Sequence, residues 1–475
     1  MTRRHWAIAV FSLAVHLWGL TAPLLDHHAW RQTQTASMAR NYATQGMRFL
    51  EPMLDYQGPP VRAGTEFPAY SYLLACAYRL FGVHEALGRL LASAFAAWGA
   101  LFLYGFVRRR LGDSIGLASA LVLCVLPVHL YFTRTVQPES MALWALLGFL
   151  YCWDRWLRDR GAATLALALA LACLGPLLKL AYLYLVLPIG LALAWEHRGW
   201  RRAAAPCAVL ALAVLAPAWA WYQYARTAPV QVLPLDASFQ LEALRSATQL
   251  WFYRNLILYR LPTLCATFAG TALAGVGAWA LWLRLRTGGA RGIAFLVSWL
   301  VATALYLILM GKYGVHHEYT MLPAEPVIAT FIGAGIWFCW ERTARVQWLK
   351  PTVIALVLAI PLQSGLFVER WYRLGQTYLL SAGEAFQRIS RPEDLVLTNS
   401  RELPTALYHL NRYGYSVDLA SRGVEAVDAY LARGVRYLLT PTSGAWSEHP
   451  EWAGYLAERG AVVHRDREFL IFRFP

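Results

Sequence analysis

Residues 161–195 read GAATLALALALACLGPLLKLAYLYLVLPIGLALAW, and this stretch decides the fold class. Lys179 is its one charged residue. A helix that crosses a bilayer core needs about 20 apolar residues, so the stretch predicts two membrane helices joined at Lys179. The segments on either side, 154–160 and 196–202, each carry three Arg. Because Lys and Arg concentrate in cytoplasmic loops, both flanks are predicted inside and Lys179 outside.

The whole chain has the composition of a membrane protein. Of its 475 residues, 58% are apolar and only 15% are charged, against about 25% charged in a soluble domain. This argues against a soluble enzyme. Stretches without Asp, Glu, Lys or Arg predict a polytopic α-helical protein with about eleven transmembrane helices, at 5–25, 90–107, 114–133, 140–153, 161–178, 180–195, 203–225, 261–283, 292–311, 326–340 and 351–368. The first stretch is interpreted as a retained span, not a cleaved signal peptide.

The placement of Lys and Arg predicts the orientation. With the N-terminus inside, the inner segments carry 17 Lys and Arg, whereas each short outer loop carries one. An odd number of spans then puts the C-terminus outside. We therefore expect a multi-pass protein of a bacterial cytoplasmic (inner) membrane, surrounded by membrane lipids, with a cytoplasmic N-terminus. The net charge of +15 comes from Arg scattered between spans, so no nucleic-acid partner is predicted.

Two domains are predicted, residues 1–369 in the membrane and residues 370–475 outside it. The second part is rich in charged residues and alternates helix and strand signals. Strands are expected at 394–398, 435–440 and 468–474, and a helix at 423–433. A small periplasmic or extracellular α/β domain is the predicted result.

The first outer loop, 26–89, is assigned to the membrane domain. Its sequence predicts helices over 29–45 and 68–81, with the Pro- and Gly-rich turn Gln57-Gly-Pro-Pro between them. Their moderate hydrophobicity favours helices that lie in the membrane interface and do not cross it.

Two acidic residues are the candidate catalytic groups. Asp26 follows the first predicted span, where a carboxylate can meet both a lipid-borne and a water-borne group and act as a general base. Glu139 begins the fourth span on the same predicted membrane face. An ordinary helix-terminal carboxylate is the alternative interpretation of each. The shared face favours a catalytic pair.

Lys179 is one of three lysines in a chain with 40 arginines. An ammonium at the bilayer edge is costly unless it is paired, and Lys binds phosphate as a point charge, so Lys179 is predicted to bind substrate. A side chain that snorkels to the interface is the alternative. Arg62 and Glu66 are expected to line the same cavity, with solvated loop charges as the alternative.

The outer loop 314–320 holds His316, His317 and Tyr319. Hydrogen bonds from this loop to a sugar or a phosphate are the favoured interpretation, and a bound divalent metal is the weaker one. Seven cysteines occur without a CxxC spacing, so no disulfide framework and no zinc site are expected. No metal site and no cofactor are predicted.

Several short motifs follow one another in a recognisable order. They are Asp26 after the first span, Trp30-Arg31-Gln32, Ala39-Arg40, Glu66-Phe-Pro, Pro138-Glu139, Lys179 and His316-His317-Glu-Tyr319. In this order the chain resembles the GT-C glycosyltransferases of the protein O-mannosyltransferase and lipid A aminoarabinose transferase type. The likeness covers nearly all of residues 1–340 and the tail more loosely.

The resemblance implies a GT-C fold and a role for each matching residue. Asp26 corresponds to the family's catalytic base and Glu139 to the acidic residue that assists it. Substrate binding is implied for Arg31, Arg62, Glu66, Arg134, Lys179, His316, His317 and Tyr319. Where aminoarabinose transferases have a phosphate-binding Lys in the first loop, this chain has Glu66. Arg62, Lys179 or Arg134 is expected to take over that contact.

The resemblance further implies the reaction. The expected enzyme is an inverting glycosyltransferase that moves one sugar from a polyprenyl phosphate to lipid A, another glycan or a protein of the cell envelope. Other interpretations are a lipid-linked glycan flippase or transporter, a polymer ligase with a polyprenyl diphosphate donor, and a non-catalytic scaffold protein. Transporters usually have repeated halves with interrupted helices, and no internal repeat is evident in the sequence.

Overall fold

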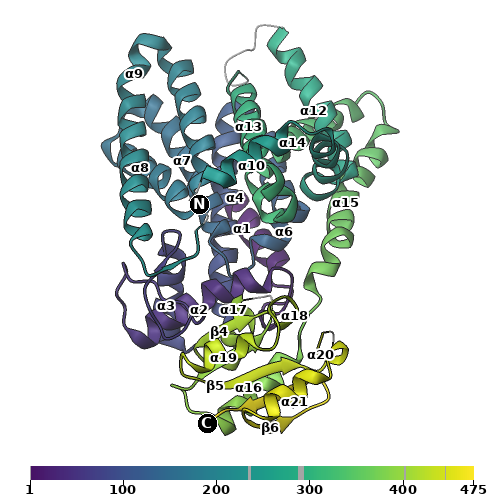
Figure 1. Cartoon of the computed structure of the whole chain (residues 1–475). Coiled ribbons are helices and arrows are strands. Elements are labelled where there is room, and N and C mark those ends of the chain that lie inside the picture. The colour runs from purple at the N-terminus through teal and green to yellow at the C-terminus, as the bar shows by residue number, and fades with distance from the viewer. Residues whose placement is uncertain (1, 234–236, 287–293, 401–402, 444) are drawn as a thin grey trace. The chain divides into compact units, whose positions relative to one another are not determined.

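The computed structural model describes residues 2–233, 237–286, 294–400, 403–443 and 445–475. The chain forms two compact units, and Figure 1 labels many of their elements. The first unit holds the residues up to Leu20, Arg89–Tyr224 and Leu233–Trp371. The second holds Thr21–Gly88, Ala225–Val232 and Tyr372–Pro475.

The first unit is helical. Its α-helices are α1 (Arg3–His16), α4 (Glu85–Leu111, whose first turn lies in the second unit), α5 (Asp113–Val125), α6 (Pro127–Phe132), α7 (Glu139–Asp159), α8 (Ala162–Leu178), α9 (Leu183–Arg226), α10 (Ala237–Ala247), α11 (Leu250–Arg254), α12 (Phe268–Arg286), α13 (Ala294–His316), α14 (Glu325–Thr343) and α15 (Leu349–Val368). The 3-10 helices η1 (Leu180–Tyr182), η3 (Glu318–Ala324) and η4 (Glu369–Tyr372) follow α8, α13 and α15. A π-helix, η2 (Asn255–Cys265), follows α11.

Several of these helices match membrane spans. Among the described residues, five helical segments are long and apolar enough to cross a bilayer, namely Glu85–Leu111, Leu180–His197, Arg201–Arg226, Glu318–Thr343 and Leu349–Tyr372. A sixth is possible if η2 and α12, which are bent by 103° at their junction, count as one span. The chain is therefore polytopic and helical, as expected. The predicted number of eleven spans remains a prediction, and residues 292 and 293 of the span 292–311 lie outside the described residues.

The first predicted span is shorter than expected. Residues 5–25 carry no charge, but α1 ends at His16, because Gly19 takes a left-handed conformation (φ 68°) and Pro23 follows. The predicted span 114–133 is likewise divided, since Leu126 is extended before Pro127, which starts α6. Asp26 therefore follows a non-helical segment and not the end of a helix.

Small residues let the helices of the first unit approach closely. A Cβ atom on Gly277 of α12 would lie 1.9 Å from the carbonyl oxygen of Phe331 in α14, and one on Gly335 of α14 would lie 2.0 Å from that of Leu273. No side chain is tolerated at such distances. Close backbone contact of this kind is typical of helices that pack within a membrane.

The second unit combines the first outer loop with the C-terminal part of the chain. Its elements are α2 (Ala29–Gln45), β1 (Ala63–Gly64), α3 (Ala69–Phe81), β2 (Val230–Gln231), α16 (Tyr378–Ile389), β3 (Leu395–Asn399), α17 (Leu403–Leu410), β4 (Gly414–Val417), α18 (Leu419–Arg422), α19 (Ala426–Leu431), β5 (Val435–Pro441), α20 (Ala445–Glu448), α21 (Glu451–Ala457), β6 (Ala461–Arg465) and β7 (Phe469–Arg473). The helices and strands predicted for the loop and the tail are present.

A five-stranded sheet organises the C-terminal part. Its strand order is β4-β3-β5-β7-β6; β3 pairs with β4 and β5 in parallel, and β7 pairs with β5 and β6 antiparallel. One face of the sheet buries apolar side chains such as Leu397, Leu438 and Phe472 against α19 and α21. The core of this part is therefore formed between the sheet and its helices.

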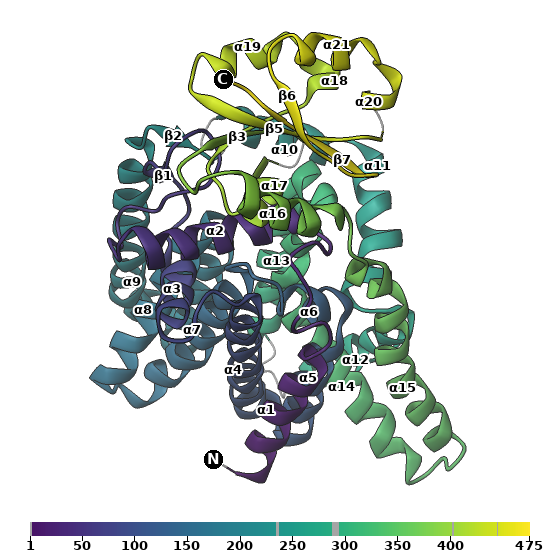
Figure 2. The ribbon, with the colours of Figure 1, turned by 90° about the horizontal axis from the view of Figure 1, so that it is seen from below.

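Hydrogen bonds join the first outer loop to the C-terminal part within the second unit. Helix α2 packs along α17 (Figure 2). The backbone N–H of Gly414 donates to the carbonyl of Asp55 at 3.1 Å, and that of Gly375 donates to Leu25 at 2.8 Å. These bonds join residues that are more than 300 positions apart in the sequence. The conformation of the first outer loop therefore depends on the C-terminal part.

Candidate active site

Asp26 is held by a neighbouring amide. The residue is 3% exposed, and its Oδ1 accepts a hydrogen bond of 2.6 Å from Nε2 of Gln32. Gln32 is the fourth residue of α2, is fully buried, and also donates to the carbonyl of His27 at 3.2 Å. The α2 helix begins after His28, whose left-handed conformation (φ 58°) turns the chain sharply beyond Asp26. The carboxylate thus has a fixed orientation.

A second series of polar contacts starts at Arg31, the residue before Gln32 in α2. Arg31 forms an ion pair with Glu66 and donates to Oε1 of Gln34 at 3.0 Å. Gln34 in turn donates to the hydroxyl of Tyr56 at 3.1 Å. Burial raises the pKa of Tyr56 well above its usual value, so the phenol stays protonated. Glu66 therefore sits beside the guanidinium of Arg31.

Arg62 is bound to another part of the same unit. Its Nη2 donates to the carbonyl and the hydroxyl of Thr227, at 2.8 and 2.9 Å. The adjacent strand β1 pairs with β2 in the segment that contains Thr227. Arg62 thus fastens the segment 225–232 to the first outer loop.

Glu139 and Lys179 form an ion pair in the first unit. Glu139 is the first residue of α7, and Lys179 follows the last residue of α8. Nζ of Lys179 lies 2.6 Å from Oε1 of Glu139, and the two side chains are 15% and 4% exposed. The ammonium also lies 5.5 Å from the ring centroid of Tyr319, close enough for a cation–π interaction. Three of the predicted site residues therefore meet at one point.

The remaining predicted residues of the first unit are close in sequence to two members of this cluster. Arg134 precedes Glu139, and His316 and His317 precede Tyr319. Arg134 is 1% exposed, and its guanidinium carbon lies 5.1 Å from the ring centroid of Tyr131. His317 precedes η3, and its ring lies 5.4 Å from that of Tyr319, whereas the side chain of His316 is exposed. The hydroxyl of Tyr319 also contacts that of Tyr313 at 3.1 Å.

The candidate residues therefore fall into two groups. Asp26, Arg31, Arg62 and Glu66 lie in the second unit, and Arg134, Glu139, Lys179, His316, His317 and Tyr319 lie in the first. The predicted pairing of Asp26 with Glu139 joins the two units and stays a prediction. Sequence reasoning gave no role to Gln32, although it stands in the quoted Trp30-Arg31-Gln32 motif.

The fold is that of GT-C membrane glycosyltransferases. Residues 63–221 match the sequence model of the family described as dolichyl-phosphate-mannose-protein mannosyltransferase. The match covers a third of the chain and begins after Asp26 and Arg31. No curated protein sequence matches the chain.

Two solved structures extend the likeness to the whole chain. ArnT from Cupriavidus metallidurans bound to undecaprenyl phosphate has a TM-score of 0.67 and 14% identity over 99% of this chain and 98% of its own. The oligosaccharyltransferase AglB from Archaeoglobus fulgidus, in complex with an inhibitory peptide and a dolichol-phosphate, has a TM-score of 0.58 and 13% identity over 95% of this chain and 70% of its own. The expected resemblance to GT-C glycosyltransferases is confirmed.

Proposed function

We propose that the chain is an inverting glycosyltransferase that moves one sugar from a polyprenyl phosphate to an envelope acceptor, which is lipid A, another glycan or a protein. The observation that carries the proposal is a buried carboxylate, Asp26, held in one orientation by Gln32 in a chain with the GT-C fold. Both structural neighbours were solved with a polyprenyl-type phosphate lipid, which favours a donor of this chemistry.

The proposed reaction is a single displacement at the anomeric carbon. An acceptor hydroxyl attacks C1 from the face opposite the phosphate, and Asp26 takes up the hydroxyl proton. The bond between the acceptor oxygen and C1 forms while the bond between C1 and the phosphate oxygen breaks. The electron pair leaves with the polyprenyl phosphate, which is stable as an anion and needs no general acid. Attack from the opposite face inverts C1.

Cationic side chains act on the leaving group. In the proposal, Lys179 stabilises the negative charge that develops on the phosphate, and Glu139 holds the ammonium in place and orients the acceptor. Arg134 is a further buried cation of the first unit, and the proposal assigns it to the same phosphate site. Arg62 is a weaker candidate because Thr227 already accepts two of its hydrogen bonds.

The proposal includes a topology. The active site faces the outer side of a bacterial cytoplasmic membrane, the N-terminus is cytoplasmic, and the chain crosses the bilayer eleven times. The concentration of Arg in every second connecting segment supports this orientation. Cysteines introduced singly at positions 158 and 418, in a variant whose seven native cysteines are replaced by serine, test it by labelling of intact and permeabilised cells. Only position 418 should react in cells whose inner membrane is intact.

The decisive experiment measures sugar transfer by the full chain in lipid nanodiscs. Undecaprenyl phosphates that bear single labelled sugars are supplied with an envelope extract as acceptor, and the product is analysed by mass spectrometry. Asp26→Asn should lower kcat by about 10²–10⁴-fold, the usual contribution of a general base. Asp159→Asn is the matched control, since Asp159 is exposed and pairs only weakly with Arg155.

Each alternative function has its own outcome. Near wild-type transfer by Asp26→Asn would overturn the role of Asp26. Movement of the lipid across the bilayer without transfer would indicate a flippase. Exclusive use of a polyprenyl diphosphate that bears a long glycan would indicate a polymer ligase.

A further inference from the structure

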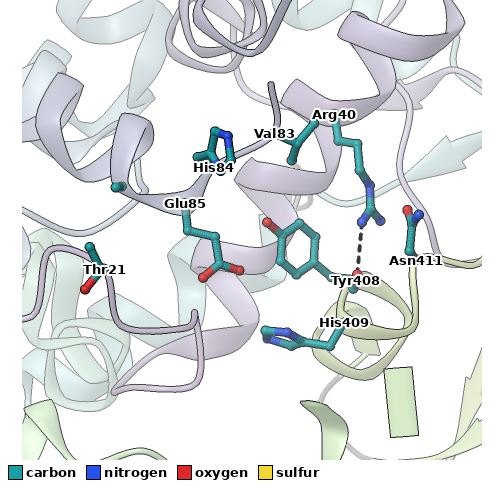
Figure 3. Close-up of a pocket in the computed structure, with 9 residues that line it drawn as sticks. Thr21, Arg40, Val83, His84, Glu85, Tyr408, His409 and Asn411 are labelled. Atoms are coloured by element: carbon teal, nitrogen blue, oxygen red, sulfur yellow. Dashed lines mark hydrogen bonds between the residues drawn. The ribbon is translucent and has the colours of Figure 1, made fainter. Parts of the chain in front are cut away.

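The second unit contains a pocket that the proposed reaction does not use. Its volume is about 420 Å³, within the range of roughly 300–1,000 Å³ that is usual for small-molecule sites. Thr21, Glu85 and the segment Tyr408–Asn411 supply its walls from distant parts of the sequence (Figure 3). All the lining residues belong to the second unit.

The charges in the pocket disfavour an anionic ligand. Arg40 lines it, but its guanidinium forms an ion pair with Asp55 and donates to the carbonyl of Tyr408 at 3.0 Å. Glu85 adds a carboxylate, whose Oε2 accepts the backbone N–H of Leu24 at 3.1 Å. With its cation balanced and a carboxylate in the wall, the pocket repels a phosphate.

Two further titratable groups of the wall, His409 and Tyr408, are neutral at physiological pH. Burial lowers the pKa of His409 to about 4 and raises that of Tyr408 well above its usual value. The wall thus offers an imidazole, a phenol, the amide of Asn411 and the hydroxyl of Thr21. Together with Glu85 these groups both donate and accept hydrogen bonds. Such a mixture suits the neighbouring hydroxyl groups of an uncharged sugar ring.

The pocket is tied to the segment that carries the proposed base. Glu85 binds the N–H of Leu24, and Nε2 of His409 lies 3.4 Å from the carbonyl oxygen of the same residue. Two residues of chain span at most about 7 Å. The Cα atom of Asp26 therefore lies within about 7 Å of the Cα atom of Leu24, which the pocket residues bind. A ligand seated here lies next to the position where the acceptor hydroxyl is needed.

We propose that this pocket binds an uncharged sugar residue of the acceptor, which makes the acceptor a glycan. The assignment to the acceptor rests on the proposed function, whereas the binding of a sugar does not. Glu85 and Asn411 are the groups that contact the sugar hydroxyls, and His84 borders the site from the exposed loop before α4.

Binding is tested directly by saturation-transfer NMR on the full chain in nanodiscs. The probes are the methyl glycosides of glucose, galactose and mannose, with glucose 1-phosphate as the anionic probe. Glu85→Gln and Asn411→Gly should each weaken glycoside binding about tenfold, because each changes a group that contacts the sugar hydroxyls. Glu85→Gln should also strengthen binding of glucose 1-phosphate. His84→Ala provides a third variant that disturbs no buried group.

Matched controls are available for both substitutions. Asn411 is left-handed (φ 53°), so Gly keeps the backbone conformation; Gln376→Gly makes the same change at another left-handed position (φ 49°) outside the pocket. Glu458→Gln removes an exposed carboxylate. Both controls should bind the glycosides as the wild type does. Unchanged affinity in all three pocket variants, or preferred binding of glucose 1-phosphate by the wild type, would overturn the proposal.

Kinetics separate this proposal from the proposed function. In the transfer assay the pocket variants should raise the KM for the acceptor and leave the KM for the lipid donor unchanged. If the wild type binds glycosides and the variants do not, but no donor supports transfer, the sugar site stands and the proposed function fails. If the wild type transfers sugar and the variants keep both the acceptor KM and the glycoside affinity, only the pocket assignment fails.

Discussion

Nε2 of Gln32 lies 2.6 Å from Oδ1 of Asp26, and both side chains are buried. A neutral amide that donates to a carboxylate fixes the orientation of the carboxylate without neutralising its charge. A general base needs such an arrangement, because its carboxylate must be in the correct orientation and unprotonated when the acceptor hydroxyl gives up its proton. Gln32 is therefore expected to act through Asp26, as a positioning residue.

Replacing Gln32 tests this relationship. Gln32→Met has a similar shape but cannot donate a hydrogen bond, and hydrogen bonds to charged groups contribute about 1.5–3 kcal/mol. We expect kcat to fall by about 10–100-fold, with the KM of the lipid donor unchanged. Gln45→Met, at the exposed end of the same helix, should keep wild-type kinetics. Equal kinetics for the two variants in the nanodisc assay would contradict the role of Gln32.

The ion pair between Glu139 and Lys179 predicts a rescue. Lys179→Met leaves the Glu139 carboxylate buried without its ammonium partner, a change that costs about 3–5 kcal/mol in buried pairs. The variant should lose thermal stability in detergent, measured by size-exclusion chromatography after heating. Adding Glu139→Gln should restore most of the stability but no transfer activity. Lys350→Met, at a peripheral lysine, is the control, and a double variant as unstable as Lys179→Met would contradict this explanation.

Asp55 is predicted to hold the first outer loop together and to keep Arg40 in place, which donates to the carbonyl of Tyr408 in the C-terminal part. It is fully buried, pairs with Arg40 and accepts a bond of 3.0 Å from Nδ2 of Asn41. Asp55→Asn leaves the Arg40 guanidinium without a counter-charge, so we expect a loss of about 3–5 kcal/mol and faster proteolysis of the loop. Limited proteolysis of the variant beside Asp159→Asn measures the effect. Equal rates would show that the pair is dispensable.

His409 predicts a pH dependence of stability. Its pKa in the folded state is about 4, because burial disfavours the charged imidazole, and the ordinary value is 6.5. Below pH 6.5 the unfolded chain takes up a proton that the folded chain does not. The contribution is fully present above pH 6.5 and is lost as the pH falls to about 4, by about 3 kcal/mol in all.

The measurement is the melting temperature of the wild type and of His409→Gln between pH 7.5 and pH 4. Gln keeps a hydrogen-bond donor near the carbonyl of Leu24 but has no proton to gain. The wild type should therefore lose more stability on acidification than the variant. Parallel curves would exclude His409 as the titrating group.

The sequence predicted the helices better than their ends. Every charge-free stretch contains helix among the described residues, because burial in lipid demands apolar side chains. The absence of charge does not reveal where a helix stops, so residues 17–25 were wrongly assigned to the first span. A left-handed Gly19 ends that helix. The presence of a glycine in the sequence does not predict that it adopts a left-handed conformation.

The sequence singled out individual candidate residues but did not predict the contacts between them. Glu139 and Lys179 each stood out because a charged side chain at the membrane boundary is costly unless it is paired. Their pairing with each other depends on the packing of α7 and α8. Gln32 is uncharged and sits in a polar helix, so composition gave no signal for it. Only its place in the quoted motif pointed to a role.

The joining of the first outer loop to the last hundred residues has a consequence for biosynthesis. The loop leaves the ribosome long before Tyr372, and at roughly 5–20 residues per second the interval is on the order of tens of seconds. Throughout that time the face of α2 that α17 later covers is bare. A translation product that ends before α17 therefore lacks the partner that covers this face of the first outer loop.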